Sequence, residues 1–283
     1  MRILYVTDLH GDKNKYEKIL EIAIYNDIKV IVNGGDMLPK LCDRHQEQPI
    51  FIKEYLRDYF SRLKQHDIKY LSMLGNDDLS IVDKVFDDIC NEFDNVYNMA
   101  QNKVRIDEYE FIGMNYILDH PFGCKDRIVM EDCYVFQSQL MSYALLSNER
   151  DYDVIEDWIG YATTKLPKMR DILNELPVPD NMDKTIYITH IPPSGLKLGQ
   201  LGSQDLDIGS MDIYDFFKEK QPLLTLHGHI HESPDTRTGN WINAIDKTVC
   251  INTGQTEIGS DILIYADIDL KSQKYVREKV FVI

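Results

Sequence analysis

The sequence predicts an α/β layered domain with a largely parallel sheet, and two observations in its N-terminal part support this. Short apolar runs at residues 2–7, 28–33 and 68–74 are typical of buried strands. Between them, residues 12–24 and 48–66 repeat apolar side chains at helical spacing. Strands that alternate with helices in this way usually form a parallel sheet joined by helical crossovers.

The remaining chain continues this pattern with one interruption. Residues 95–118 are strand-like, and residues 184–189 form another buried-strand run. We interpret residues 119–183 as a helical insertion within a single domain of residues 1–283, because the segment is short and its ends lead back into the same sheet. A separate domain is the alternative. The other predicted elements are helices at 137–147, 152–176 and 211–220, a strand at 223–226 and paired strands at 241–283.

The composition is that of an ordinary globular protein with a strong acidic balance. Of the 283 residues, 43% are apolar and 28% are charged, and the formal net charge is −16. Because the electric field of a strongly negative protein repels polyanions, stable nucleic-acid binding is not expected. A small phosphorylated substrate remains compatible, since divalent cations can reverse the sign of the charge inside a cleft.

Cysteine usage and apolar patterning bear on the compartment. The five cysteines are scattered and form no C-x-x-C pair, which fits free thiols in a reducing cytosol. The N-terminus lacks the apolar stretch of a signal peptide, and no apolar run is long enough to cross a bilayer. We therefore predict a cytoplasmic protein without a membrane partner, and the sequence leaves the oligomeric state open.

Side chains that bind metals follow the predicted strands. In open α/β sheets, ligands bind beyond the carboxyl ends of the strands, so these side chains are expected to share one edge. Carboxylates and imidazoles together favour Mn, Fe, Zn, Co or Ni over Ca or Mg, and the scarcity of thiolates argues against a structural zinc site. The candidate metal ligands are Asp8, His10, Asp36, Asn76, His190, His229 and His231.

Five short motifs carry these residues: D-L-H at 8–10, G-G-D at 34–36, G-N-D-D at 75–78, T-H at 189–190 and G-H-I-H at 228–231. Glycine before the ligands of three motifs lets the backbone turn tightly near an ion. The ordered set resembles the calcineurin-like metallophosphoesterase superfamily. Further motifs, among them I-P-P-S-G at 191–195 and N-T-G at 252–254, resemble a stand-alone prokaryotic branch of it. The resemblance implies a four-layer α/β/β/α sandwich, in which two mixed β-sheets lie face to face and are flanked by helices.

The resemblance also implies a ligand scheme and a chemistry. In that scheme one divalent ion is held by Asp8, His10 and His231, a second by Asn76, His190 and His229, and both by Asp36. Manganese is the expected metal, with iron, zinc, nickel or cobalt as alternatives. A hydroxide that bridges the two ions would attack phosphorus in line and hydrolyse a phosphate ester without a covalent intermediate.

One motif departs from the family pattern. Asp77 occupies the position where the family usually has a histidine that contacts the phosphate and protonates the leaving group. An aspartate brings negative charge toward an anionic substrate, so it would help only if it were protonated or turned aside. The resemblance gives Asp78 the role of orienting His10. Asp77 and Asp78 are therefore the candidate catalytic residues, and we expect weak activity on poor leaving groups.

The predicted function is hydrolysis of a small phosphorylated substrate, with a phosphodiester favoured over a monoester because Asp77 replaces the histidine. The alternatives are a phosphomonoesterase, a protein phosphatase and a catalytically weak metal-binding scaffold. A protein phosphatase is disfavoured because residues 35–40, G-D-M-L-P-K, lack the arginine found there in Ser/Thr phosphatases of the superfamily. The intact ligand set counts against a scaffold.

Two further histidines lie near the motifs. His227 precedes the G-H-I-H motif and is expected to pack beneath the site. His120 begins the insertion and is expected to be an ordinary loop residue, with a reach into the cleft as the alternative.

Overall fold

Both ends of the chain contribute to the first of two six-stranded mixed sheets in the computed structural model, which describes residues 1–132, 143–202 and 206–282. The strands lie in the order β16 (Lys274–Phe281), β15 (Ile262–Asp269), β1 (Arg2–Val6), β2 (Val30–Asn33), β3 (Lys69–Ser72) and β4 (Val96–Asn98). Strands β1 to β4 are parallel, whereas β15 is antiparallel to both β1 and β16. The first three predicted strands are therefore neighbours and end at one edge.

The second sheet is built from strands that lie between residues 103 and 252. Its strands lie in the order β13 (Ile242–Ile245), β14 (Thr248–Asn252), β12 (Leu224–His227), β9 (Thr185–Thr189), β6 (Tyr109–Met114) and β5 (Lys103–Ile106). The four central strands are parallel, and the two outer strands pair antiparallel with their neighbours. Strands β9 and β12 thus present His190 and the G-H-I-H motif at the same edge.

The two sheets face each other across an apolar layer. Ile3 and Tyr5 of β1 belong to this layer together with Ile186 of β9, whereas Leu4 and Val6 on the other face of β1 pack with the helices. Because the strands are buried on both faces, they appear in the sequence as continuous apolar runs rather than as alternating ones.

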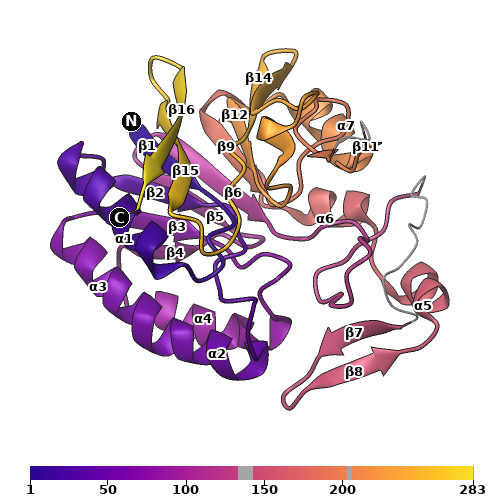
Figure 1. The fold of residues 1–283 in the computed structure, drawn as a ribbon. Coiled ribbons are helices and arrows are strands. Elements are labelled where there is room, and N and C mark those ends of the chain that lie inside the picture. Colours follow the sequence, from indigo (N-terminus) through magenta and orange to yellow (C-terminus); the bar gives the residue numbers. More distant parts are fainter. Residues whose placement is uncertain (133–142, 203–205, 283) are drawn as a thin grey trace.

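Helices cover the outer face of each sheet, as Figure 1 shows. The first sheet is covered by α1 (Lys13–Tyr25), α2 (Arg44–Ile50), α3 (Arg57–Gln65) and α4 (Asp83–Cys90), and the second by α6 (Met169–Glu175) and α7 (Met211–Lys220). Helix α5 (Trp158–Lys165) lies farther out, within the 119–183 segment. The predicted four-layer α/β/β/α sandwich, with two mixed sheets flanked by helices, is confirmed.

The helix predicted over residues 48–66 begins earlier than the apolar periodicity indicated. Helix α2 starts at Arg44 because the Asp43 side chain caps it by accepting a hydrogen bond from the Gln46 backbone N–H (3.3 Å). The chain then passes through a π-helical stretch, Phe51–Leu56, directly into α3. The earlier start places Arg44 on this helix, at the end nearest the ligand motifs.

The predicted helices of the 119–183 segment are wrong in part. Residues 137–142 of the first lie outside the described ranges, and its remainder is strand β7 (Ala144–Ser147), paired with β8 (Tyr152–Ile155). A local turn makes this hairpin, because the Asn148 side chain accepts hydrogen bonds from the backbone N–H groups of Arg150 and Asp151. The second predicted helix begins only at Trp158 and is interrupted at Pro167, between α5 and α6.

Two further short strands, β10 (Gln200–Leu201) and β11 (Leu206–Asp207), pair antiparallel near the ligand motifs. Within the described ranges, no helix is long and apolar enough to span a membrane. The four cysteines in those ranges, Cys42, Cys90, Cys124 and Cys250, are free thiols. The cytoplasmic location stays a prediction.

Candidate metal centre

The structure gathers the seven candidate ligands at the carboxyl edge of both sheets. The residues that follow β1, β2 and β3 supply Asp8, His10, Asp36 and Asn76, and those that follow β9 and β12 supply His190, His229 and His231. Two groups of side chains have ligand atoms within 4.8 Å of one another: Asp8, His10, Asp36 and His231 form one, and Asp36, His190 and His229 form the other. Asp36 belongs to both groups, which is the position that a bridging ligand requires.

Several of these residues adopt a backbone conformation that side chains rarely tolerate. The φ angles are 57° at Asp8, 46° at His10, 52° at Asp36 and 66° at His229. Such left-handed residues persist only where the surroundings fix them, and they cluster at functional sites. Here the backbone N–H of Asp8 donates to the Gly35 carbonyl (2.9 Å), and that of His10 donates to the Asp36 carbonyl (2.9 Å).

Two glycines make room for the ligands in different ways. Gly35 has a φ of 115°, so it makes a turn that other residues avoid. A Cβ on Gly75 would lie 2.3 Å from Asp36 Oδ1, so glycine is needed there for close approach. The turn around Asn76 therefore packs directly against the shared carboxylate.

The first group of ligands is tightly convergent. His10 Nε2 lies 3.0 Å from His231 Nε2, and His231 Nε2 lies 3.4 Å from Asp8 Oδ1. His10 Nε2 is 4.0 Å from Asp36 Oδ2. Asp8 also accepts a hydrogen bond from the backbone N–H of His229 (3.1 Å), which links the motif after β1 to the motif after β12.

The second group is arranged around His190, which is fully buried. Its Nδ1–H donates to the Gly34 carbonyl (2.9 Å), so its Nε2 faces the site, 3.4 Å from Asp36 Oδ2 and 3.0 Å from Asn76 Oδ1. Asn76 thus joins His190 and Asp36 although it is not a titratable group. His229 Nε2 is buried and, among the described residues, has no hydrogen-bond partner.

The electrostatics of these buried groups are consistent with metal ligation. Burial lowers the pKa of His10 to about 3 and holds the pKa of His229 well below its usual value, so both imidazoles are neutral donors. At His190, burial opposes the positive charge, but the Asp36 carboxylate outweighs it and raises the pKa to about 9. Burial disfavours the charged form of Asp36, yet nearby His190 brings the pKa of Asp36 well below its usual range. A divalent cation can replace the positive charge that protonated His190 supplies.

The residues present fit a metal centre by their chemistry. Imidazole nitrogens, carboxylates and one amide oxygen are suitable donors for divalent transition metals. One shared cation would account for the close approach of His10 Nε2 to His231 Nε2. His229 Nε2, which has no hydrogen-bond partner among the described residues, is available to a second cation.

Asp78 does not have the predicted role of orienting His10. Its carboxylate instead accepts hydrogen bonds from the backbone N–H groups of Gly75 (2.7 Å), Met37 (3.0 Å) and Leu38 (2.8 Å). His10 Nδ1 is buried and has no partner within the described part of the chain. Asp78 is therefore an anchor between two loops, and the prediction that it orients His10 is corrected.

Asp77 lies at the site and is turned toward two cations. Its Oδ2 accepts a hydrogen bond from Lys40 Nζ (3.0 Å), and its Oδ1 lies 3.8 Å from a guanidinium nitrogen of Arg44. Its backbone N–H donates to Asp36 Oδ1 (2.8 Å). Sequence reasoning missed Lys40 and Arg44, although Lys40 lies in the loop that follows the G-G-D motif and this position could have indicated it.

The two additional histidines have different surroundings. His227 is fully buried, with Nε2 2.8 Å from the hydroxyl of Thr225 and Nδ1 2.9 Å from that of Thr189, so it packs beneath the ligands as expected. His120, expected to be an ordinary loop residue, instead reaches the cleft: its ring centroid is 4.6 Å from that of His229. Its Nε2 is buried and, among the described residues, lacks a hydrogen-bond partner.

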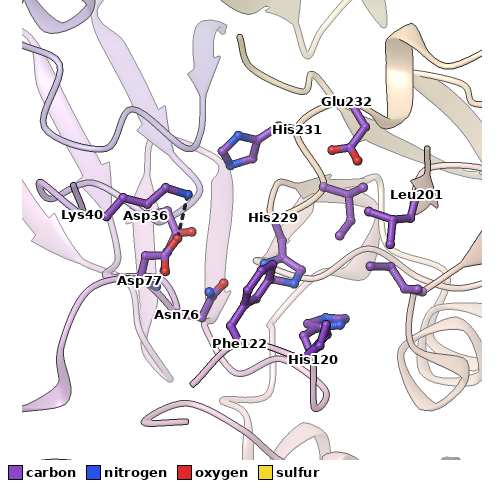
Figure 2. Close-up of a pocket in the computed structure, with 13 residues that line it drawn as sticks. Asp36, Lys40, Asn76, Asp77, His120, Phe122, Leu201, His229, His231 and Glu232 are labelled. Atoms are coloured by element: carbon purple, nitrogen blue, oxygen red, sulfur yellow. Dashed lines mark hydrogen bonds and ion pairs between the residues drawn. The ribbon is translucent and has the colours of Figure 1, made fainter. Parts of the chain in front are cut away.

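Two cavities meet at the ligands. One, of about 220 Å³, extends past His229 and His231 to an apolar wall that includes Phe122, Leu201 and Ile208. The other, of about 300 Å³, extends past Arg44 and Cys124. Lys40, Asn76, Asp77, His120 and Phe122 line both. Figure 2 shows Lys40 and Asp77 on one side of the first cavity, with Leu201 and His120 on the other.

Comparison with known proteins identifies the family. The family model described as calcineurin-like phosphoesterase matches residues 1–233. The chain belongs to this family. It is therefore a metallophosphoesterase, a hydrolase that acts on phosphoric esters, and the family's members depend on a dinuclear metal centre.

Solved structures show the same fold at low sequence identity. One crystal structure has a TM-score of 0.62 at 16% identity, and 98% of each chain is covered. The protein TT1561 of Thermus thermophilus has a TM-score of 0.57 at 16% identity, with 100% of this chain and 99% of that chain covered. A structure described as a novel archaeal phosphodiesterase has a TM-score of 0.46 and is too distant to support an argument about activity. No curated protein sequence matches the chain.

Proposed function

We propose that the chain hydrolyses small phosphodiesters with two divalent metal ions, of which manganese is the expected one. One ion would be held by Asp8, His10 and His231, the other by Asn76, His190 and His229, and Asp36 would be shared. Such a centre would supply positive charge for the phosphate and a hydroxide nucleophile at neutral pH. The chain's own residues orient these ions, and their burial excludes bulk water from the floor of the cleft.

The preference for a diester rests on the two cavities, which meet at Lys40, Asn76 and Asp77. A phosphodiester carries an organic group on each of two ester oxygens, whereas a monoester carries only one. Since the cleft continues in two directions from Asn76 and Asp77, it can accommodate both ester groups of a diester at once. Phe122 and Leu201 add an apolar surface at which an organic ester group can be desolvated.

The test compares hydrolysis of bis-p-nitrophenyl phosphate with that of p-nitrophenyl phosphate by manganese-loaded protein. The two substrates share a leaving group, so the ratio of their kcat/KM values reports the preference for a second ester group. We expect the diester to be favoured and Asp36→Asn to abolish both activities. Faster monoester hydrolysis would identify a phosphomonoesterase, and no turnover with Mn, Ni, Co, Zn or Fe would identify a metal-binding scaffold.

A further inference from the structure

A cluster of three charged side chains, Lys40, Arg44 and Asp77, forms one wall of the cleft beside the ligands, and we name it the cationic wall. Lys40 Nζ lies 3.0 Å from Asp77 Oδ2, and Arg44 lies 3.8 Å from Asp77 Oδ1. Two cations thus surround one carboxylate, so the wall has a formal charge of +1. The aspartate that seemed unfavourable to an anionic substrate is neutralised within the protein.

Neighbouring contacts hold the wall in place. The Gln48 side-chain amide donates to the Pro39 carbonyl (3.0 Å) and to the Asp77 carbonyl (2.9 Å), so it ties the loop that carries Lys40 to the turn that carries Asp77. Arg44 also donates to the Asp77 carbonyl (3.4 Å). Because Gln48 and Arg44 lie on α2, one helix fixes both parts of the wall, and the charges need little reorganisation when a substrate binds.

Lys40 is placed to reach a substrate. Its side chain is 27% exposed and lines both cavities, so it lies where they meet. Figure 2 shows its ammonium group directed toward Asp36 and Asp77, across the cleft from Leu201. Among the described residues its hydrogen-bond partner is Asp77 alone, and an ammonium group has three N–H donors. Two donors therefore remain for a ligand in the cleft.

We propose that Lys40 binds a non-bridging oxygen of the scissile phosphate and that Asp77 positions Lys40 for this contact. The inference deepens the proposed function and rests on it for the identity of the substrate. A fixed ammonium group next to the phosphate stabilises the negative charge that grows on its oxygens in the transition state. Asp77 thereby acts through Lys40 instead of protonating the leaving group.

The variants separate charge, length and positioning. Lys40→Met removes the charge but keeps most of the side-chain length, and Lys40→Arg keeps the charge. Asp77→Asn removes the positioning carboxylate with little change in shape. Lys29→Met is the matched control, because Lys29 lies at the opposite end of β2 and pairs with Asp27 at the surface (3.0 Å).

The experiment uses manganese-loaded protein and measures kcat and KM for bis-p-nitrophenyl phosphate, the affinity for inorganic phosphate by calorimetry, and metal content. For Lys40→Met we expect kcat/KM to fall about a hundredfold, as for loss of one oxyanion donor, and phosphate affinity to fall about tenfold. Metal content stays at the wild-type value. Lys40→Arg retains most of both properties, and Lys29→Met is unchanged in all three.

A double-mutant cycle distinguishes positioning from acid catalysis. If Asp77 positions Lys40, Asp77→Asn lowers kcat/KM about tenfold in the wild-type background and has no further effect in Lys40→Met. If Asp77 protonated the leaving group, the loss would be equal in both backgrounds, and its assigned role would be wrong.

Phosphate affinity keeps this inference separable from the proposed function. If no diester were hydrolysed, the proposed function would fail, yet weaker phosphate binding by Lys40→Met would still support the contact. Unchanged phosphate affinity in Lys40→Met would overturn the proposal even in an active phosphodiesterase. Loss of metal from Lys40→Met would also overturn it, because Lys40 would then support the metal centre rather than bind substrate.

Discussion

The two sides of the cleft are built by different means. The floor consists of ligands at strand ends that are almost completely buried: Asp8 and Asp36 are each 1% exposed and His190 is 0% exposed. The cationic wall is more open, with side chains of Lys40 and Asp77 that are 27% and 25% exposed. Strand register and left-handed backbone fix the floor, whereas ion pairs between loops and α2 fix the wall.

This difference indicates how each side responds to substitution. A change on the floor alters metal binding and leaves a buried polar group without a partner, so activity and stability change together. A change on the wall alters a half-buried ion pair, so its effect is expected mainly on the substrate. The following predictions test the floor and its supports, and they proceed from the largest expected effect to the smallest.

Asp36→Asn is expected to have the largest effect. Asp36 is common to both groups of candidate ligands, and the substitution removes the negative charge that the two groups share. Loss of several kcal/mol of transition-state stabilisation corresponds to a fall in kcat of about a thousandfold or more. Activity assays and metal analysis after dialysis would measure this. The control is Asp88→Asn, at an exposed position on α4; a variant that kept both metals and turnover would contradict the bridging role of Asp36.

Asp78→Ala tests the anchor between the floor and the wall. Its carboxylate accepts hydrogen bonds from the backbone N–H groups of Gly75, Met37 and Leu38. The substitution would leave these buried donors without partners. At about 1 kcal/mol for each of the three unsatisfied donors, we expect the free energy of unfolding to fall by about 3 kcal/mol. Urea denaturation at pH 8 would measure it. If stability stayed the same while only kcat fell, Asp78 would be a catalytic residue after all.

The sequence predicted the floor far better than the wall. The motifs containing Asp8, Asp36 and His190 follow apolar runs that are continuous because their strands are buried on both faces, so strand ends and ligands could be placed together. The contacts of Asp77 and Asp78 depend on loop conformation and, apart from the local bond to Gly75, on partners 29 to 41 residues away in the chain. No local periodicity encodes such contacts, so Lys40 and Arg44 were missed and Asp78 received the wrong role.

The 119–183 segment was predicted least well for a related reason. The hairpin of β7 and β8 depends on the Asn148 turn and on pairing between strands, and both compete with helical spacing of apolar residues. The position of His120 depends on the conformation of its loop as well: Lys125 donates to Asp119 (2.7 Å) and to the His120 carbonyl within the buried loop. These contacts bring the loop histidine against His229, which sequence spacing alone does not indicate.

Acidification tests the support beneath the floor. Burial lowers the pKa of His227 to about 3, below the value of about 6.5 expected in the unfolded chain. Because the folded protein disfavours the protonated form, the stability contributed by neutral His227 is complete above pH 6.5 and is lost as the pH falls toward 3. Each such group contributes a slope of about 1.4 kcal/mol per pH unit in that window.

His227→Gln separates this contribution from those of the other buried histidines. After chelator treatment of both proteins, we expect the free energy of unfolding of the variant to fall less steeply than that of wild type between about pH 6 and pH 4.5. The difference in slope corresponds to about one bound proton. Urea denaturation at several pH values would measure the slope, and His66→Gln, on the exposed end of α3, is the control. Identical slopes for wild type and His227→Gln would mean that His227 is not held neutral by its surroundings.

Tyr5→Phe is expected to have the smallest effect, and it tests whether the floor depends on the packing of one sheet against the other. The Tyr5 hydroxyl donates to the His227 carbonyl (2.8 Å) across the buried layer, immediately below the G-H-I-H motif. We expect a loss of about 1 kcal/mol in the free energy of unfolding, as for one buried hydrogen bond, with unchanged metal content. Tyr97→Phe is the matched control, because its hydroxyl donates to the Asp94 carbonyl (3.0 Å) at the surface and should matter less. Equal losses in the two variants would show that this inter-sheet contact contributes no more to stability than a surface one.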